Sequence, residues 1–530
     1  MKKLFLILYL PLLAIATFAQ SGIATPSFTK YDAMLFSKQE INGTARFVGV
    51  SGAMGALGGD ASTIFYNPAG IGIYRSSEFT ASLNVHWNNA TMKDVGSMQR
   101  RVNANLGNAA YVAHWDIGAS RGKENGLIGM SLGIAYNRMK NYDRAYTYSR
   151  TKNYSKTQFL ADDAYGQPEG CLNEKNFNNP DVGYRAILGY ETYLFDPVYE
   201  KDPATGEMRL KNYESHFKKY GCTSATDNVS VTENGGGNEF ALSLAGNISD
   251  IFYLGMSFIC NYVTNNRYET YTESMSNGAY TRLYNSTQLN ATGFTYKIGI
   301  ILRPTSWLRI GGAYHTPTVY HARANYYGTA YSNINPDPTK QNPEAWTPNS
   351  SEHCYFNAPM KAIGSLGFLF GKYGFLGIDY QWDNYAGIKL KNSSKFDVTS
   401  HTATREGLID THTIRAGIEV KPIDALSLRL GGSYTTSCTD NDKATRYYYP
   451  NDVRTDTYYI NDLDSYSVSA GAGFRVGRHS FDIAYIWQVN HGRYYEFRPY
   501  STGETAGLTI EPMTLRNVRN NITFSYSVRF

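Results

Sequence analysis

Near the C-terminus, apolar and polar residues alternate without interruption up to the last position of the chain. From 522 to 530 every second residue is apolar: Ile522, Phe524, Tyr526, Val528 and Phe530 alternate with Thr523, Ser525, Ser527 and Arg529. Successive side chains of a β-strand point to opposite faces, so a period of two predicts a strand with one apolar and one polar face. The same pattern recurs at 411–421, 464–476 and 480–495, where we also expect strands.

Segments of this kind fill most of the chain. We expect fourteen strands, at 77–90, 106–119, 126–148, 238–248, 252–270, 291–303, 307–322, 360–370, 373–390, 411–421, 426–438, 464–476, 480–495 and 515–530. Every second connection is very short, such as 249–251, and the connections between them are long, the longest running from 149 to 237. Short turns at one end and long loops at the other are typical of outer-membrane barrels. The fold class predicted is all-β, a 14-stranded antiparallel transmembrane β-barrel over residues 77–530.

The alternation of turn lengths also predicts an orientation in the membrane. An even number of strands returns the C-terminus to the short-turn side, which faces the periplasm in single-chain bacterial barrels. The loop 149–237 is then expected outside the cell. Tyrosine clusters beside the long loops are candidates for an outer aromatic girdle; they lie at 326–327, 447–449, 458–459 and 494–495.

The first residues have the features of a secretory signal. Lys2 and Lys3 precede an apolar stretch from Leu4 to Leu13, and small residues follow up to Ala19. This order of charge, apolar stretch and small residues predicts a signal peptide, residues 1–19, cleaved after Ala19. The apolar stretch is too short to span a bilayer as an anchor. The signal peptide and the strand pattern together predict export to the Gram-negative outer membrane.

Composition and charge narrow the function classes. The chain has 45 Tyr and 49 Gly, with 14% aromatic and only 18% charged residues. This composition suits twisted strands with aromatic belts, and the mean hydropathy of -0.40 agrees with strands that turn only every second residue to lipid. The formal charge is +5, or +3 once Lys2 and Lys3 leave with the signal, which is too small and too scattered for nucleic acid.

The cysteines do not indicate a metal site. Their number is odd and their spacing wide: they are Cys171, Cys222, Cys260, Cys354 and Cys438. Without a CxxC or Cys/His ligand spacing, the sequence supports no metal or other cofactor. Cys171 and Cys222 fall in one predicted loop, where a disulfide and two free thiols are both compatible with an oxidising compartment.

Residues 20–76 show no sustained alternation and precede the first strand. Gly49, Gly52, Gly55 and Gly58 recur at every third position, which at helical spacing makes a stripe of small residues. Each glycine weakens a helix in water by ~1 kcal/mol relative to alanine, so this segment needs surrounding protein to hold it. We therefore expect an N-terminal hatch (plug) inside the barrel; a flexible periplasmic tail is the alternative.

A short motif follows the glycines, directly before the first strand. In Asn67-Pro68-Ala69-Gly70, proline fixes its own φ and keeps Asn67 out of the helical region, and glycine permits a sharp reversal. In this position, behind Gly59-Asp60-Ala61, the motif resembles the hatch motif of the FadL/TodX family of outer-membrane transporters. Hairpins such as 296–300 with 308–315 are similar to those of the family as well.

The resemblance implies uptake of long-chain fatty acids or other hydrophobic compounds, aromatic compounds and haem among them. In such a protein the ligand is captured at the outer face and leaves sideways through the barrel wall, past lipopolysaccharide and into the lipid. A monomer without cofactor is expected. Phe530, at the end of its alternating strand, resembles the assembly signal read by the barrel-assembly machinery.

A fatty-acid pocket needs an apolar lining and one or two cations for the carboxylate. Alternation places five candidate cations on the lumen face of the wall: Lys297, Arg309, Arg415, Arg429 and Arg475. Buried charges in a lumen usually pair with one another. A structural ion pair with Glu419, Asp482 or Asp379 is therefore the favoured interpretation of these side chains.

Other function classes fit less well. Residues 129–133 read Gly-Met-Ser-Leu-Gly, the G-x-S-x-G pattern of hydrolases, but they lie in mid-strand without the strand-turn-helix context that the pattern requires. A TonB-dependent receptor needs a far larger plug than residues 20–76. A general porin, or a structural surface barrel without a specific hydrophobic ligand, remains the alternative; the hatch argues against an open pore.

Overall fold

The computed structural model describes residues 27–118, 125–173, 175–179, 181–336, 339, 341–395, 407–448 and 451–530. The predicted signal peptide, 1–19, and the first residues of the predicted hatch lie outside the described residues, as does Tyr449 of one tyrosine cluster. No described helix is long and apolar enough to cross a bilayer.

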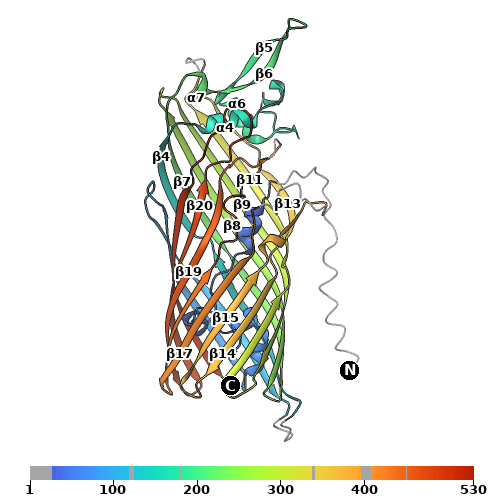
Figure 1. Ribbon diagram of the computed structural model, residues 1–530, viewed down its shortest axis with the longest axis vertical. Coiled ribbons are helices and arrows are strands. Elements are labelled where there is room, and N and C mark those ends of the chain that lie inside the picture. Colours follow the sequence, from blue (N-terminus) through green and yellow to red (C-terminus); the bar gives the residue numbers. More distant parts are fainter. Residues whose placement is uncertain are drawn as a thin grey trace.

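The wall is one closed antiparallel sheet (Figure 1). Among the described residues it contains 19 strands. They are β1 (Glu78–Met92), β2 (Gln99–Asp116), β3 (Leu127–Asn141), β4 (Arg144–Lys152), β7 (Ala225–Ile248), β8 (Phe252–Met275), β9 (Tyr280–Leu302), β10 (Leu308–His315), β11 (Val319–Ser332), β12 (Glu344–Trp346), β13 (Ser350–Asn357), β14 (Lys361–Leu369), β15 (Gly374–Asp383), β16 (Lys389–Lys391), β17 (Thr411–Ile423), β18 (Leu426–Thr435), β19 (Tyr459–Val476), β20 (His479–Tyr495) and β21 (Met513–Arg529).

Some of these strands continue one another along a single crossing of the wall, as β3 and β4 do, so the described chain crosses 14 times. The first and last strands close the barrel: β1 pairs with β21 from Glu78 opposite Arg529 to Met92 opposite Leu515. Closure of the sheet in this way pairs the first and last strands, which would otherwise be its free edges. The predicted 14-stranded antiparallel barrel is confirmed.

Several strands run farther than the sequence pattern predicted. β7 and β8 have 24 residues each and β9 has 23. Residues expected in a long connection between 270 and 291 are therefore strand, with only a short turn between β8 and β9. Backbone pairing continues there, although the outward residues of β9 change from apolar to polar (Ser286, Gln288, Asn290). A strand whose outward residues are polar shows no alternation of apolar and polar positions, so this pattern cannot predict it.

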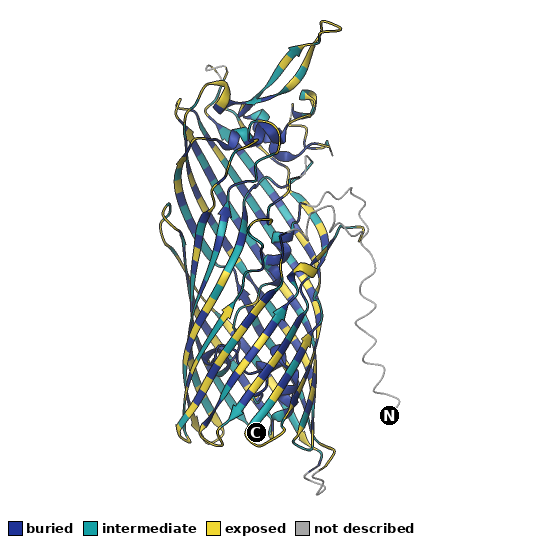
Figure 2. Ribbon diagram, viewed as in Figure 1, coloured by how far each residue is buried: buried dark blue, intermediate teal, exposed yellow. Residues whose placement is uncertain are grey.

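An apolar belt surrounds the half of the barrel that carries the short turns. On β9 the exposed residues of the belt are Phe294, Tyr296, Ile298, Ile300 and Leu302. The alternation of exposed and buried residues in this half is visible in Figure 2. Such a band of lipid-facing side chains identifies the membrane-spanning zone of a barrel, so the wall extends beyond the membrane on the long-loop side.

Three tyrosines of the predicted outer girdle face the interior of the barrel. Tyr326, Tyr459 and Tyr494 are 2%, 5% and 2% exposed, because they point inward from the extended strands. The exposed aromatic residues of the wall lie closer to the belt, with Tyr262 and Tyr380 as examples. The prediction was wrong for these three tyrosines, since their strands continue beyond the membrane and turn them toward the interior.

The segment between β4 and β7 folds into a cap at the long-loop end (Figure 1). The cap contains four short helices and a separate hairpin: α4 (Lys156–Asp163), α5 (Glu169–Leu172), α6 (Tyr184–Glu191), α7 (His216–Lys219), β5 (Phe195–Lys201) and β6 (Met208–Ser215). Its apolar core, with Phe159, Ile187 and Phe195 almost fully buried, is shared with Ala330 of β11 and with Phe497 of the β20–β21 connection. The cap spans residues 153–224, a shorter stretch than the 149–237 expected, because β4 and β7 extend into that range.

Residues 27–77 lie inside the barrel (Figure 1). They form α1 (Lys30–Ser37) in the long-loop half, and α2 (Ala45–Gly49), α3 (Thr63–Tyr66) and the 3-10 helix η2 (Pro68–Ile73) near the short-turn end. Their side chains are largely buried against the inner wall. Another short 3-10 helix, η4 (Tyr385–Gly387), follows β15.

Candidate functional site

The glycine-rich part of the hatch is not a helix. Only α2 is helical there, and the chain then turns repeatedly, with φ of +50° at Ser51, +78° at Gly52, +63° at Gly58 and +66° at Gly59. These left-handed conformations are incompatible with a continuous right-handed helix. The expected helical stripe of small residues is therefore wrong; the glycines serve tight turns instead.

The hatch backbone instead packs against glycines of the wall. A Cβ atom on Gly377 would lie 2.2 Å from the main-chain oxygen of Ala53, and one on Gly417 2.5 Å from that of Val50. The same holds for Gly311, whose added Cβ would be 2.6 Å from the oxygen of Gly55. Their three strands, β10, β15 and β17, thus form a seat that only glycine permits. Sequence reasoning missed this seat, although glycine at lumen-facing positions of strands was its available signal.

The Asn67-Pro68-Ala69-Gly70 turn packs in the same way against Gly255 of β8 and Gly299 of β9. Asn67 has φ −134° and ψ 99°, as expected for the residue before proline, and its side-chain oxygen accepts a hydrogen bond of 3.2 Å from the Ala69 nitrogen. Its amide nitrogen donates to the main-chain oxygens of Gly55, at 2.6 Å, and of Ile300 in β9, at 3.2 Å. Asn67 therefore joins two parts of the hatch to each other and to the wall.

Three cationic or polar wall residues bind hatch carbonyl groups. Lys297 donates to the Phe65 oxygen at 2.7 Å, and Arg309 donates to the Leu57 oxygen. His315, not singled out from the sequence, lies 2.7 Å from the Tyr66 oxygen through Nε2. Lys297 is also 3.5 Å from a carboxylate, that of Glu239. Lys297 and Arg309 thus hold the hatch and do not face an open space.

The remaining candidate cations differ in surroundings. Arg429 lies in ion pairs with Glu419, at 2.7 Å, and Asp482, at 2.6 Å; the hatch residue Arg46 also contacts Glu419, at 3.0 Å. Arg475 is exposed at the short-turn rim, where its Nε donates to the Gly477 oxygen at 3.3 Å. Among the described residues, neither arginine lines a cavity of the lumen.

A cavity of about 280 Å³ lies between the hatch and the long-loop half of the wall, which we name the outer half. Arg415 is the one of the five candidate cations that lines it. Its guanidinium donates to the Tyr66 hydroxyl at 2.5 Å and to Gln381 at 2.9 Å, and lies 5.1 Å from the centre of the Tyr66 ring. Asp379, named as a possible partner, instead accepts from the Gly55 nitrogen at 3.1 Å.

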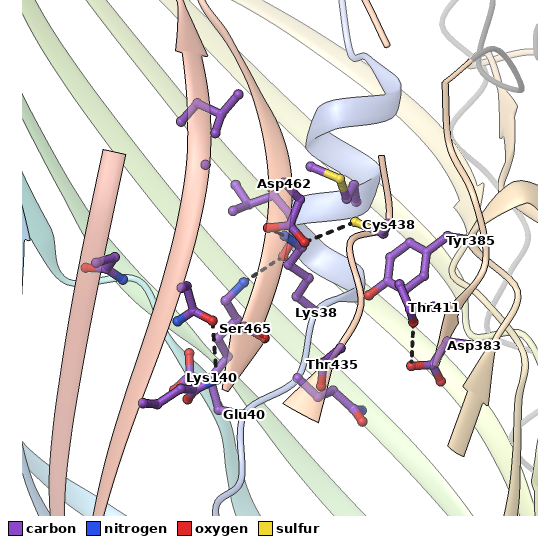
Figure 3. A pocket seen from close by; sticks show the side chains of 18 of the residues that line it. Lys38, Glu40, Lys140, Asp383, Tyr385, Thr411, Thr435, Cys438, Asp462 and Ser465 are labelled. Atoms are coloured by element: carbon purple, nitrogen blue, oxygen red, sulfur yellow. Dashed lines mark hydrogen bonds and ion pairs between the residues drawn. The ribbon is translucent and has the colours of Figure 1, made fainter. Parts of the chain in front are cut away.

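Much of the cavity lining was not anticipated from the sequence. Lys38 at the end of α1 forms an ion pair with Asp462, which also accepts from the Cys438 thiol at 3.5 Å (Figure 3). Lys140 of β3 points into the same space and donates to the Leu35 oxygen at 3.1 Å. These side chains come from segments far apart in the sequence. The only sequence signal for the strand residues among them was their position on the lumen-facing side of the alternation.

The apolar part of the outer lumen is occupied by α1 and the residues before it. Phe28 and Tyr320 stack on Phe356, with ring centres 5.4 and 4.8 Å away, and the tilted ring of Phe36 lies 5.8 Å from it. Lys38, on the same segment, faces the polar cavity. The outer lumen thus has one apolar side and one charged side.

The cap is joined to the barrel by a buried ion network. Arg185 of α6 lies 2.9 Å from Asp163 and 3.0 Å from Asp452 of the β18–β19 connection. Burial alone would lower the pKa of Arg185, but the two carboxylates raise it well above the ordinary value. Cys171 and Cys222 of the cap are free thiols. The cap therefore holds a defined position over the outer end of the lumen.

The wall is interrupted between β2 and β3. These strands pair from Asn108 opposite Asn137 to Asp116 opposite Gly129. Within the described residues, β2 from Gln99 to Leu106 pairs only with β1, and β4 pairs only with β7. Single contacts link the two sides of the interruption: the Asn88 side chain donates to the main-chain oxygen of Asp143 at 3.0 Å, and the Ser149 nitrogen of β4 donates to the main-chain oxygen of Val95, between β1 and β2, at 2.9 Å.

A small cavity of about 20 Å³ lies at this interruption. Its lining is rich in polar side chains, which are Glu40, Asn42, Asn84, His86, Asn105, Arg138, Asn141, Gln488, Arg519 and Asn521. Asn141, Gln488 and Arg519 also line the larger cavity, so the two spaces adjoin. A path of polar residues thus leads from the central cavity to the gap in the wall.

The hydrolase-like pattern is part of the wall. Ser131 lies in the middle of β3, where its hydroxyl is 3.1 Å from Nδ1 of His114 in β2. No turn or helix follows it, so the strand-turn-helix geometry of a nucleophile elbow is not formed. Among the described residues, no group of three or more His, Cys, Asp or Glu side chains is placed to hold a metal ion.

In sequence, the chain matches no protein-family profile and no curated protein. In structure, it is similar to a Pseudomonas aeruginosa FadL homologue, with 13% identity and a TM-score of 0.54 over 93% of this chain and 99% of that one. Weaker likenesses include the toluene transporters TbuX of Ralstonia pickettii and TodX of Pseudomonas putida, each 11% identical with a TM-score of 0.47, over 93% of this chain and 100% and 99% of theirs. The likeness to the FadL homologue shows that the chain has the fold expected from the hatch motif.

Proposed function

We propose that this protein takes up hydrophobic compounds across the outer membrane, with long-chain fatty acids as the expected cargo. The observation that carries the proposal is the gap between β2 and β3, which adjoins a cavity above a tightly seated hatch. The hatch blocks the direct route along the barrel axis. A compound in the cavity can therefore leave by the side, into the bilayer.

Lateral release suits a cargo that prefers lipid to water. Lipopolysaccharide resists the passage of apolar compounds from outside, whereas the bilayer interior accepts them. The gap lies beside outward residues of the apolar belt: Leu83 is 60% exposed and Ile134 is 59% exposed. A compound leaving there passes from protein to hydrocarbon without crossing bulk water.

The charged side of the cavity suits a carboxylate headgroup. Arg415 and Lys140 both face the cavity, and neither forms an ion pair with a carboxylate among the described residues. Charge-assisted hydrogen bonds to a ligand carboxylate are roughly twice as strong as neutral ones. The acyl chain would follow the apolar side, where Phe28, Phe36 and Phe356 now pack together. Binding of a long chain would then require α1 to move aside.

The test is uptake of a labelled long-chain fatty acid by a transport-deficient host that carries the protein. Asn105→Trp would fill the small cavity at the gap, and Gln288→Trp, on the outward face of β9, is the matched control. We expect the gap variant to lose most uptake and the control to keep it, at equal amounts of folded barrel. Unchanged uptake with Asn105→Trp would contradict lateral release through this gap.

A general porin is the second candidate, and conductance separates the two. A porin conducts ions steadily in planar bilayers, whereas a barrel closed by a seated hatch conducts little. The close packing of the hatch on Gly377, Gly417 and Gly311 supports the closed form. Steady conductance with no hydrophobic uptake would favour the porin.

A further inference from the structure

A group of basic side chains, three lysines, one arginine and two histidines, lies on the outward face of the wall, above the apolar belt on the cap side. Its members come from β11, β13 and β16 and from the residues directly after β16, and we name them the basic patch: His321, Arg323, His353, Lys389, Lys391 and Lys395. All except Lys391 are exposed, and Lys391 is partly exposed. None of them lines the lumen cavities.

Strand register places the members side by side. Arg323 is opposite His353, and His321 is opposite Tyr355, which is itself opposite Lys391. The His321 and His353 rings are 3.2 Å apart at their nearest nitrogens. Cross-strand neighbours on one face lie ~5 Å apart, so a single anionic group can reach several of these side chains.

The patch begins where the belt ends. Val319 of β11, 54% exposed, is opposite Phe294, the belt residue of β9 that lies farthest toward the cap. The next two outward residues along β11 are His321 and Arg323. A lipid whose acyl chains cover Val319 and Phe294 therefore has its headgroup at the level of the patch.

The positive charge of the patch is not neutralised within the described protein. Arg323 donates to the Ser351 hydroxyl at 3.0 Å, and Lys395 lies 5.5 Å from the centre of the Tyr355 ring. Among the described residues, no ion pair joins any of its lysines or its arginine to a carboxylate. The cations of the lumen differ: Arg429, for example, lies between Glu419 and Asp482.

We propose that the basic patch binds the phosphate groups of a lipid in the outer leaflet, a phosphorylated glycolipid of the lipid A type. Arginine and lysine bind phosphate through charge-assisted hydrogen bonds, and cations next to a membrane attract anionic headgroups. The apolar belt directly below receives the acyl chains, which a soluble phosphate lacks. This binding is independent of the transported compound. It fixes how deeply the barrel sits in the outer leaflet and how the barrel is oriented there.

The experiment uses the full-length protein, stripped of lipid in detergent and titrated with bis-phosphorylated lipid A under native mass spectrometry. Arg323→Gln/Lys389→Gln/Lys391→Gln removes three charges of the patch. Arg209→Gln/Lys211→Gln, on the exposed β6 of the cap hairpin, is the matched control. We expect the triple variant to bind roughly 100-fold more weakly, about fivefold for each removed charge, and the control to bind as the wild type does.

Two further probes identify what is recognised. Dephosphorylated lipid A should bind the wild type as weakly as phosphorylated lipid A binds the triple variant, and millimolar inorganic phosphate should not displace the lipid. Equal binding of lipid A by wild type and triple variant, or of the phosphorylated and dephosphorylated lipids by wild type, would overturn the proposal. Displacement by inorganic phosphate would assign the patch to a soluble anion and overturn it too. Should the triple variant fail to fold, Arg323→Gln and Lys391→Gln are compared singly, each with an expected fivefold loss.

Discussion

The side-chain amide of Asn67 in the hatch donates a hydrogen bond of 3.2 Å to the main-chain oxygen of Ile300 in strand β9. The same amide binds Gly55, and the preceding residue, Tyr66, receives a hydrogen bond from Arg415 at the cavity floor. The hatch motif thus connects the wall, the hatch and the cavity. Changes at Asn67 should reach the cavity through Tyr66, while the wall keeps its own hydrogen bonds.

We expect Asn67→Ala with Pro68→Ala to leave folding and surface display intact and to reduce hydrophobic uptake strongly. Each lost hydrogen bond of a buried group costs about 1–3 kcal/mol locally, which frees the hatch turn and displaces the cavity floor. The barrel is stabilised by strand pairing that does not involve this turn. Accumulation of a labelled long-chain fatty acid is measured at matched barrel levels; equal uptake by both versions would reduce the motif to an ordinary turn.

Gly377→Val should displace the hatch without preventing barrel formation. A Cβ at this position would lie 2.2 Å from the Ala53 oxygen, so the hatch backbone must move. Gly364→Val is the matched control in the neighbouring strand β14, since no atom lies within 4 Å of its added Cβ. We expect a rise in single-channel conductance for Gly377→Val alone. Equal conductance of the two variants would show that this contact does not keep the hatch closed.

Arg415→Gln should weaken binding of a fatty acid by about tenfold or more, since hydrogen bonds to charged groups contribute ~1.5–3 kcal/mol. The corresponding fatty alcohol, which has no carboxylate, should bind equally to both versions. Arg475→Gln is the control, because Arg475 is exposed at the rim. Equal losses for acid and alcohol, measured by calorimetry with purified protein, would point to a structural role for Arg415 instead.

Deletion of Phe530, or Phe530→Asp, should sharply lower the amount of heat-modifiable folded barrel. The Phe530 side chain is 64% exposed, and its main-chain nitrogen donates to the Ser77 oxygen at 2.9 Å. Its side chain therefore adds little packing to the finished barrel, so a defect would arise during assembly. A normal amount of folded Phe530→Asp barrel in the outer membrane would rule out this signal.

The cap should be outside the cell and the β19–β20 turn in the periplasm. Gly206 lies at the exposed tip of the cap hairpin, with φ +75°, and Arg478 lies in the turn between Val476 and His479. An epitope inserted at Gly206 should be labelled on intact cells, whereas one at Arg478 should be labelled only after the outer membrane is opened. Labelling in the opposite pattern would reverse the topology.

Sequence alone determined the barrel, its strand number and the extended backbone of Asn67. These features depend on local chemistry: an alternation of period two defines which face of a strand meets lipid, and proline restricts the residue before it. The lumen-facing placement of Arg415 and Arg429 followed from the same alternation.

Tertiary structure decided the rest. The left-handed turns at Gly52 and Gly58 and the glycine seat at Gly377 exist because two backbones, distant in sequence, approach closely. The gap between β2 and β3 reflects which strands pair, and pairing partners do not appear in the pattern of either strand. Whether a luminal cation faces a cavity, as Arg415 does, or a carboxylate, as Arg429 does, depends on neighbours from other strands and from the hatch. Local alternation specifies faces, and only the assembled barrel specifies what lies opposite them.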